Sequence, residues 1–426
     1  MLFSINKTID FLKTKSKKTI DFWEKIIRTD LRYLIKGYFW LGIDYFVGSF
    51  AGLTTSIAFA NLVLPEAYGM YKYAMTIMSF LSLTTLYRLN DSLTISIARG
   101  FEGDILRILK TRIKWGLLGS VAGIILSGYY YLNNNQALSI LVLIIAFFTP
   151  IIDTPYIYGN YLSGKKKFKT LTIINTASTL AYSIGIIIAL FLSKSNVVVI
   201  TFVYLSINFL IRLIALIFVF GKYKPNNETE SNTISYGKKI SYLSIMNTVA
   251  SQIDNLFVFH YLGALELAAY VFIKKLPEHI KDSLSFLTPL STPIFSVKNM
   301  DDLRIKKETI RKSFLLAGSM LAIILVYVAL APFIFKLIFP VYKDYVFLSQ
   351  IYALSLPAAA FGVLLLNFME SARKIKKLTK LNIIFSILKT IIIFVAIKYF
   401  GLTGLVSSFL IIRIIYPLMI TYFFWF

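Results

Sequence analysis

Residues Val197–Phe218 read VVVITFVYLSINFLIRLIALIF and contain a single charged side chain, Arg212. As a helix, this run would be about 33 Å long, which matches the hydrocarbon core of a bilayer. Apolar runs of this length are uncommon in soluble domains, where helices show one apolar face and one polar face. The stretch therefore predicts a transmembrane helix.

Similar runs recur throughout the 426 residues, of which 57% are hydrophobic and 15% are charged. Soluble domains contain about 25% charged residues. The other expected spans are Tyr38–Leu62, Met70–Tyr87, Trp115–Leu132, Leu138–Tyr158, Leu171–Leu192, Ser241–Tyr261, Leu265–Phe295, Ser313–Phe339, Val346–Met369, Leu381–Ala396 and Leu402–Trp425. The pattern predicts an all-α polytopic membrane protein of about twelve transmembrane helices, in two six-helix lobes around a central cavity.

The basic residues of the loops indicate the orientation. Of the 45 Lys and Arg residues, 34 fall on one side of the expected membrane and 4, including Lys72, fall on the other. The positive-inside rule places the richer side, with both termini, in the cytoplasm and the protein in the cytoplasmic membrane. The net charge of +24 then reflects topology and attraction to anionic membrane lipid, so it predicts no nucleic-acid partner.

The most polar loop divides the chain into halves. We expect an N-lobe at 37–219, a cytoplasmic linker at 220–238 and a C-lobe at 239–426, with the site between the lobes. Residues 1–36 form a basic tail in which Lys7–Phe11 (KTIDF) recurs as Lys18–Phe22. A shift of eleven residues keeps both copies on one helix face, which favours an amphipathic helix on the cytoplasmic leaflet. The alternative is a loosely ordered basic tail.

The sequence lacks the residues and motifs that several classes of chemistry require. The chain has no cysteine and two histidines, so we expect no disulfide, no metal site and no cofactor. It contains no Walker A loop, no G-x-S-x-G and no H-E-x-x-H. The expected non-cytoplasmic loops are short and leave no room for an external catalytic domain. We therefore expect that the protein is not an enzyme.

The eighth expected span carries an unusual charge cluster at Lys274–Asp282, KKLPEHIKD. A charge in mid-membrane costs at least about 2.5 kcal/mol, so such residues usually face a partner or a water-filled cavity. Lysine and histidine donors suit an anionic ligand such as a pyrophosphate. The predicted cavity residues here are Lys274, Lys275, Glu278, His279, Lys281 and Asp282. Alternatively these residues pair within the helix and only stiffen it, or the stretch is a loop.

Other charges near or within the expected spans have several interpretations. Asp44 and Asp254 are candidates for coupling to H⁺ or Na⁺, or for structural pairs with a lysine of the eighth span. Arg88, at the mouth of the second span, is a further candidate for the cavity or a solvated partner of Asp91. Asp153 lies between two prolines in a pattern typical of a broken helix. For four more, snorkelling to the headgroups is the simpler explanation: Arg212, Lys336, Lys389 and Arg413.

Short motifs in a characteristic order resemble a known family. These are Pro65-Glu66-Ala67-Tyr68-Gly69 after the first span, Gly164-Lys165-Lys166-Lys167-Phe168 after the fourth, Gln252-Ile253-Asp254-Asn255 with Tyr261-Leu262-Gly263 and Tyr270 in the seventh to eighth, and Pro289 and Pro293 at the end of the eighth. They resemble the polysaccharide transporter family of O-antigen-type flippases, in the multidrug/oligosaccharidyl-lipid/polysaccharide superfamily. The resemblance covers roughly residues 37–426.

The resemblance implies a function in cell-envelope polysaccharide biosynthesis. Such flippases move a polyprenyl-pyrophosphate-linked oligosaccharide from the inner to the outer leaflet by alternating access, and other polysaccharide-assembly proteins are possible partners. Two alternatives remain open. A cation-coupled multidrug or small-molecule exporter of the same superfamily should have an acid-rich cavity. A membrane-embedded polysaccharide polymerase or ligase should have catalytic residues on a sizeable loop.

Overall fold

The computed structural model describes residues 31–286, 295, 302–372 and 374–425, and within them the chain is helical, without a strand. Its long helices are α2 Leu31–Leu62, α3 Pro65–Leu81, α4 Leu89–Ala98, α5 Asp104–Leu132, α6 Gln136–Phe148, α7 Ile157–Gly164, α8 Phe168–Ser193, α9 Val197–Tyr223, α10 Thr233–Leu262, α11 Ala264–Asp282, α13 Leu303–Ile338, α14 Val346–Leu354, α15 Leu356–Ser371 and α16 Ile375–Trp425. Four 3₁₀ turns adjoin them: η1 Ser82–Thr85, η2 Thr154–Tyr156, η3 Ser283–Phe286 and η4 Pro340–Tyr345. The predicted all-α class is confirmed.

Seven helical segments of the described residues are long and apolar enough to cross a membrane. The last of them, in α16, contains Gly401 at φ +59°, a conformation that favours glycine, and it covers both the eleventh and the twelfth expected spans. Fewer segments qualify than spans were expected because α16 combines two expected spans, α3 and α6 have only 17 and 13 residues, and α10 and α11 are long enough but more polar. Short and polar helices of this kind are stable in a membrane where other helices cover them.

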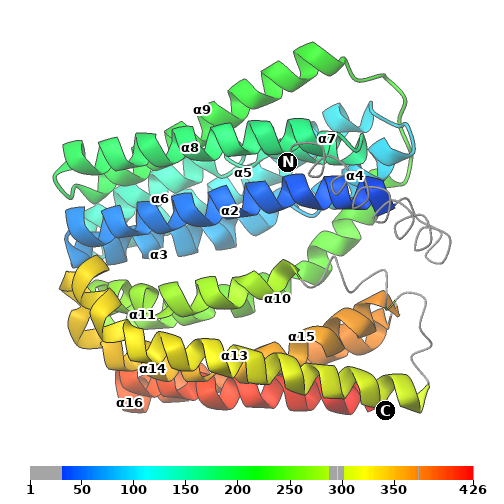
Figure 1. The fold of residues 1–426 in the computed structure, drawn as a ribbon. Helices are drawn as coiled ribbons and strands as arrows, with labels where there is room; N and C mark the ends of the chain where they lie inside the picture. Colours follow the sequence, from blue (N-terminus) through cyan, green and yellow to red (C-terminus); the bar gives the residue numbers. More distant parts are fainter. Residues whose placement is uncertain (1–30, 287–294, 296–301, 373, 426) are drawn as a thin grey trace, which may run out of the picture.

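Two helical bundles lie side by side in Figure 1, one from α2 to α9 and the other from α11 to α16, with α10 running between them. They converge at the end where α2 leads into α3 and α10 leads into α11; we call this the closed end. The opposite end carries α4, α7 and the C-terminus, and we call it the basic end because the lysine-rich loops lie there. One cluster of buried apolar side chains includes residues of both bundles.

Contacts at the closed end are close and aromatic. The rings of Tyr68 and Phe272 stack with their centroids 4.9 Å apart, and those of Tyr73 and Phe259 with theirs 3.7 Å apart. Gly69 of α3 packs directly on Ala264 at the start of α11. A Cβ atom at Gly69 would lie 2.5 Å from the carbonyl carbon of Ala264 and closer still to its oxygen. The backbones of the two bundles therefore touch at the glycine of the P-E-A-Y-G motif.

Local sequence explains several helix ends. The side chain of Asn135 accepts a hydrogen bond from the amide of Leu138 and so caps α6. Asn196 caps α9 in the same way. The broken helix predicted around Asp153 is confirmed, because α6 ends at Phe148 and helical structure resumes only at Thr154.

The connection between the bundles is fixed to the first of them. Residues 224–232 are not helical, so the loop is shorter than the expected linker at 220–238. The Gly103 amide donates to the Glu228 carbonyl at 2.8 Å, and Arg99 pairs with Glu230 at 2.6 Å. The fully buried Asp104 accepts a hydrogen bond from Thr233 at 2.7 Å. The predicted amphipathic helix of the tail falls mainly on residues 1–30, which lie outside the described residues.

Candidate functional site

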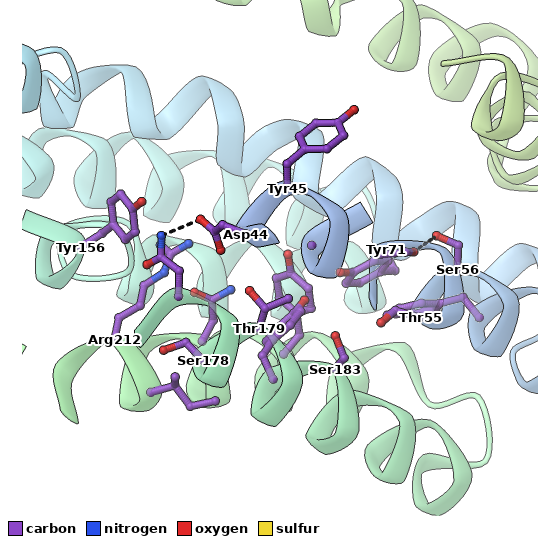
Figure 2. Close-up of a pocket in the computed structure, with 18 of the residues that line it drawn as sticks. Asp44, Tyr45, Thr55, Ser56, Tyr71, Tyr156, Ser178, Thr179, Ser183 and Arg212 are labelled. Carbon is purple, nitrogen blue, oxygen red and sulfur yellow. Dashed lines mark hydrogen bonds between the residues drawn. The ribbon is translucent and has the colours of Figure 1, made fainter. Parts of the chain in front are cut away.

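The main cavity lies almost entirely within the first bundle and has a volume of about 770 Å³. Its walls come from α2, α3, α8 and α9, from Tyr156 of η2 and Tyr158 of α7, and from a single residue of α11, Lys275. Figure 2 shows Asp44, Tyr156 and Arg212 grouped at one end, with Thr55, Ser56 and Tyr71 at the other. Ser178, Thr179 and Ser183 of α8 lie between the two groups. Along α2 the lining runs from Asp44 to Phe59, a rise of about 22 Å, so the cavity is elongated.

Aromatic and hydroxyl side chains dominate the cavity wall. Tyr204 is central to its aromatic part, because its ring meets those of Tyr71 and Tyr182 edge to face, at centroid distances of 5.5 and 5.4 Å. Serine, threonine and asparagine side chains supply further donors and acceptors. Rigid aromatic faces interspersed with hydrogen-bonding groups suit a ligand that is apolar on its ring faces and hydroxylated at its edges.

The charges of the cavity are mainly positive. Lys72, Arg212 and Lys275 line it, against one acid, Asp44. Asp44 accepts a hydrogen bond from the Asn175 side chain at 3.0 Å and has no ion pair among the described residues. The Lys72 amine lies over the Tyr68 and Tyr71 rings and has no ion pair among the described residues. Three basic side chains against one acid favour an anionic group in the cavity.

The predicted cluster of α11 divides between the cavity and buried ion pairs. Lys275 lines the cavity, whereas Lys274 pairs with Asp254 at 3.0 Å. Asp254 also accepts a hydrogen bond from the Tyr270 hydroxyl at 2.5 Å. This arrangement matches the structural pair that was one of the two interpretations of Asp254. A role of Lys274 in substrate contact or of Asp254 in ion coupling stays a prediction.

Glu278 lies in a second ion-pair network, which ties α11 to α14 and α16. Its carboxylate accepts a hydrogen bond from Arg413 at 2.5 Å and also bonds the Tyr352 hydroxyl and the Lys281 amine. The guanidinium of Arg413 stacks over the Tyr352 ring, 4.4 Å from its centroid. Glu278 and Lys281 are therefore held by protein partners, and substrate contact by either stays a prediction.

The remaining predicted residues lie around these networks. The Nδ1 atom of His279 is 3.5 Å from the Ser49 hydroxyl of α2, so this ring reaches the first bundle. Asp282 is exposed at the end of α11. Arg88 pairs with Asp91 at 2.9 Å, and both side chains are more than two-fifths exposed. Arg88 thus forms the solvated pair that was its simpler interpretation, and it does not line the main cavity.

Two cavity residues were misassigned by sequence reasoning. Lys72 was counted in a non-cytoplasmic loop, but α3 begins at Pro65, so Lys72 lies about two turns inside the helix. Snorkelling is also the wrong explanation for Arg212, which faces the cavity and pairs with Asp153. Snorkelling is also wrong for Arg413, which forms an ion pair with Glu278, and for Lys389, whose amine donates to the Ala250 carbonyl at 2.5 Å. Pro65 could have indicated that Lys72 is helical, because proline is common at the first position of a helix.

Solved structures with a similar fold are membrane transporters. The lipid II flippase MurJ in an inward closed conformation has a TM-score of 0.65 and 16% identity, over 89% of this chain and 86% of its own. An inward-facing multidrug resistance MATE family transporter of the MOP superfamily has a TM-score of 0.63 and 14% identity, over 90% and 96% of the two chains. A MOP superfamily transporter from Pyrococcus furiosus has a TM-score of 0.60 and 12% identity, over 92% and 94%.

Sequence comparison gives the family directly. No curated protein has a significantly similar sequence. The sequence profile of the family described as "Polysaccharide biosynthesis protein" matches residues 34–296, which is more than half of the chain and extends from the first turn of α2 through α11. This multi-pass membrane protein, with the fold of MOP superfamily transporters, belongs to the polysaccharide biosynthesis protein family.

Proposed function

We propose that the protein is a flippase that moves a polyprenyl-pyrophosphate-linked oligosaccharide from the inner to the outer leaflet of the cytoplasmic membrane. The observation that carries the proposal is the main cavity, where tyrosine rings and hydroxyl groups alternate and three basic side chains face one acid. The aromatic and hydroxyl groups suit sugar rings, and the basic groups attract an anionic headgroup. The family and the fold support the same assignment.

Transport proceeds by alternating access in this proposal. The lobes at 37–219 and 239–426 rock against each other, with the linker at 220–238 and both termini in the cytoplasm. The basic end then faces the cytoplasm, by the positive-inside rule, and the closed end faces outward. The described conformation, joined at the closed end, is the one that receives substrate from the inner leaflet. The isoprenoid tail stays in lipid, since its transfer to a polar cavity would cost about 0.8 kcal/mol per CH₂ group.

A cation exporter is the less favoured candidate. A cavity for organic cations needs an excess of acids, whereas this one has Lys72, Arg212 and Lys275 against Asp44. Energy coupling through Asp44 or Asp254, to H⁺ or Na⁺, is compatible with either substrate. Mutagenesis of these two acids tests whether transport is coupled to an ion.

The proposal is tested with purified protein in proteoliposomes. A fluorescent polyprenyl-pyrophosphate-linked oligosaccharide is loaded in one leaflet, and its appearance in the other is followed with and without a proton or sodium gradient. A parallel set of vesicles contains a fluorescent organic cation. We expect movement of the lipid-linked sugar and none of the cation. Movement of the cation alone would refute the flippase assignment.

A further inference from the structure

A second cavity, of about 310 Å³, adjoins the main one on the side of the basic end. The two cavities share Tyr156 and Arg212, which therefore form the partition between them. The second cavity is lined by α3, η1, α4, α5 and α9, and by Thr248 of α10. Its distinguishing residue is Arg112 of α5, which is fully buried.

Arg112 has more hydrogen-bond donors than partners. Its Nη1 atom donates to the Asn90 side-chain oxygen at 3.0 Å and to the Asp153 carbonyl at 3.2 Å. Its Nε and Nη2 atoms are buried and have no acceptor among the described residues. A buried donor without an acceptor is destabilising, and more so when the group is charged. Such a group in a cavity wall indicates a missing acceptor.

The charges around this cavity do not balance. Arg112 and Arg212 carry two positive charges, and Asp153 is the one acid of the cavity wall. The Asp153 carboxylate bonds Arg212, but its side chain is 47% exposed. Ion pairs of solvent-exposed carboxylates are weak, so Asp153 can give up Arg212 to a stronger anion. Two arginine forks, one with free donors and one with a displaceable partner, match the geometry of phosphate oxygens.

We propose that the second cavity binds the diphosphate group of the transported lipid, through Arg112 and Arg212, and that Asp153 is the internal anion which this group displaces. The identity of the ligand rests on the proposed function, whereas the site itself rests on Arg112 and the charge imbalance. With the diphosphate at the partition, the sugar chain extends into the main cavity toward Tyr71 and Lys72. The lipid end of the diphosphate then stays near the basic end, where the substrate enters.

Calorimetric titration of detergent-purified full-length protein at low salt tests the site with inorganic pyrophosphate. We expect Arg112→Gln to weaken binding at least about tenfold, because a charge-assisted hydrogen bond is lost. Asp153→Asn should tighten binding severalfold, because the competing anion is removed. Lys110→Gln is the matched control, since Lys110 is an exposed cation on the same helix, and it should leave binding unchanged. Asp153→Asn keeps the test valid if the Arg112 variant does not fold.

Further arms separate the sources of the diphosphate. Farnesyl pyrophosphate should compete with inorganic pyrophosphate and farnesyl monophosphate should compete weakly, whereas selectivity for inorganic phosphate would indicate a free-anion site and overturn the proposal. Binding that is unchanged in Arg112→Gln, or weakened in Asp153→Asn, would also overturn it. If pyrophosphate binds through Arg112 but the wild-type protein moves no lipid-linked sugar in vesicles, the proposed function fails and the anion site stands.

Discussion

Replacement of Gly69 by valine is expected to abolish transport by forcing the two bundles apart at the closed end. A side chain at this position overlaps the backbone of Ala264, which has no rotamer by which to move away. Overpacking of a tight contact costs about 1–3 kcal/mol and occasionally more. A free-energy change of about 5.5 kcal/mol converts a 99:1 ratio of two conformations to 1:99. The overpacking cost at Gly69 is smaller, but it still changes the ratio of closed to open protein strongly.

The absence of native cysteine makes the shift measurable. A single cysteine at Ser183, in the wall of the main cavity, should react with a membrane-impermeant maleimide from outside the cell faster in Gly69→Val than in the wild-type background. Gly128→Val is the matched control, because a Cβ atom at Gly128 meets nothing within 4 Å. Equal labelling in the three backgrounds, with normal transport by Gly69→Val, would show that the Gly69 contact does not control access to the cavity.

Replacement of Lys274 by methionine is expected to destabilise the protein strongly. Its partner Asp254 is 4% exposed, and the Oδ1 atom of Asp254 already lacks a hydrogen-bond partner among the described residues. Removal of one member of a buried ion pair costs about 3–5 kcal/mol, because the other charge remains buried without compensation. The fraction of protein that stays monodisperse after heating, measured by size-exclusion chromatography in detergent, should fall at a lower temperature than in the wild type.

The double variant Lys274→Met/Asp254→Asn isolates the cause. It removes both charges, and we expect it to recover most of the lost stability. It also separates the two interpretations of Asp254. Wild-type transport by the double variant would identify a structural pair, whereas a stable protein without transport would show that Lys274 or Asp254 acts in transport. A double variant as unstable as Lys274→Met would contradict the ion-pair account.

The architecture follows from features that a single sequence displays. Apolar runs such as Val197–Phe218 predict helices because a bilayer demands both length and hydrophobicity. The prolines on either side of Asp153 predict the break that opens the cavity wall, since proline disrupts helical hydrogen bonding. Gly69 was noted within its motif, but its contact with Ala264 depends on how the two bundles meet. The spacing of residues in the sequence does not show that Gly69 and Ala264 touch in the fold.

The site was harder to predict than the fold. The charged residues of α11 were identified from the sequence. Helical spacing predicts which of them share a face of the helix, but it does not predict which residues that face contacts. Lys274 and Glu278 meet Asp254 and Arg413, which lie 20 and 135 positions away in the chain. Lys275, one residue from Lys274, faces the cavity instead. The tyrosines of the wall were not identified as cavity residues, because the chain has 27 tyrosines and the sequence does not show which of them face one another.

The central claim is that the headgroup passes through the main cavity, and a side chain that fills this cavity tests it most directly. Gly48 lines the cavity with open space at its Cβ position, and Gly42, two turns earlier in α2, has similar space without lining the cavity. Proteoliposomes with Gly48→Trp should move the lipid-linked oligosaccharide at least about tenfold more slowly than the wild type, because the indole ring occupies the space that the headgroup needs. Gly42→Trp should transport normally. Wild-type rates from Gly48→Trp, in folded protein, would contradict the account.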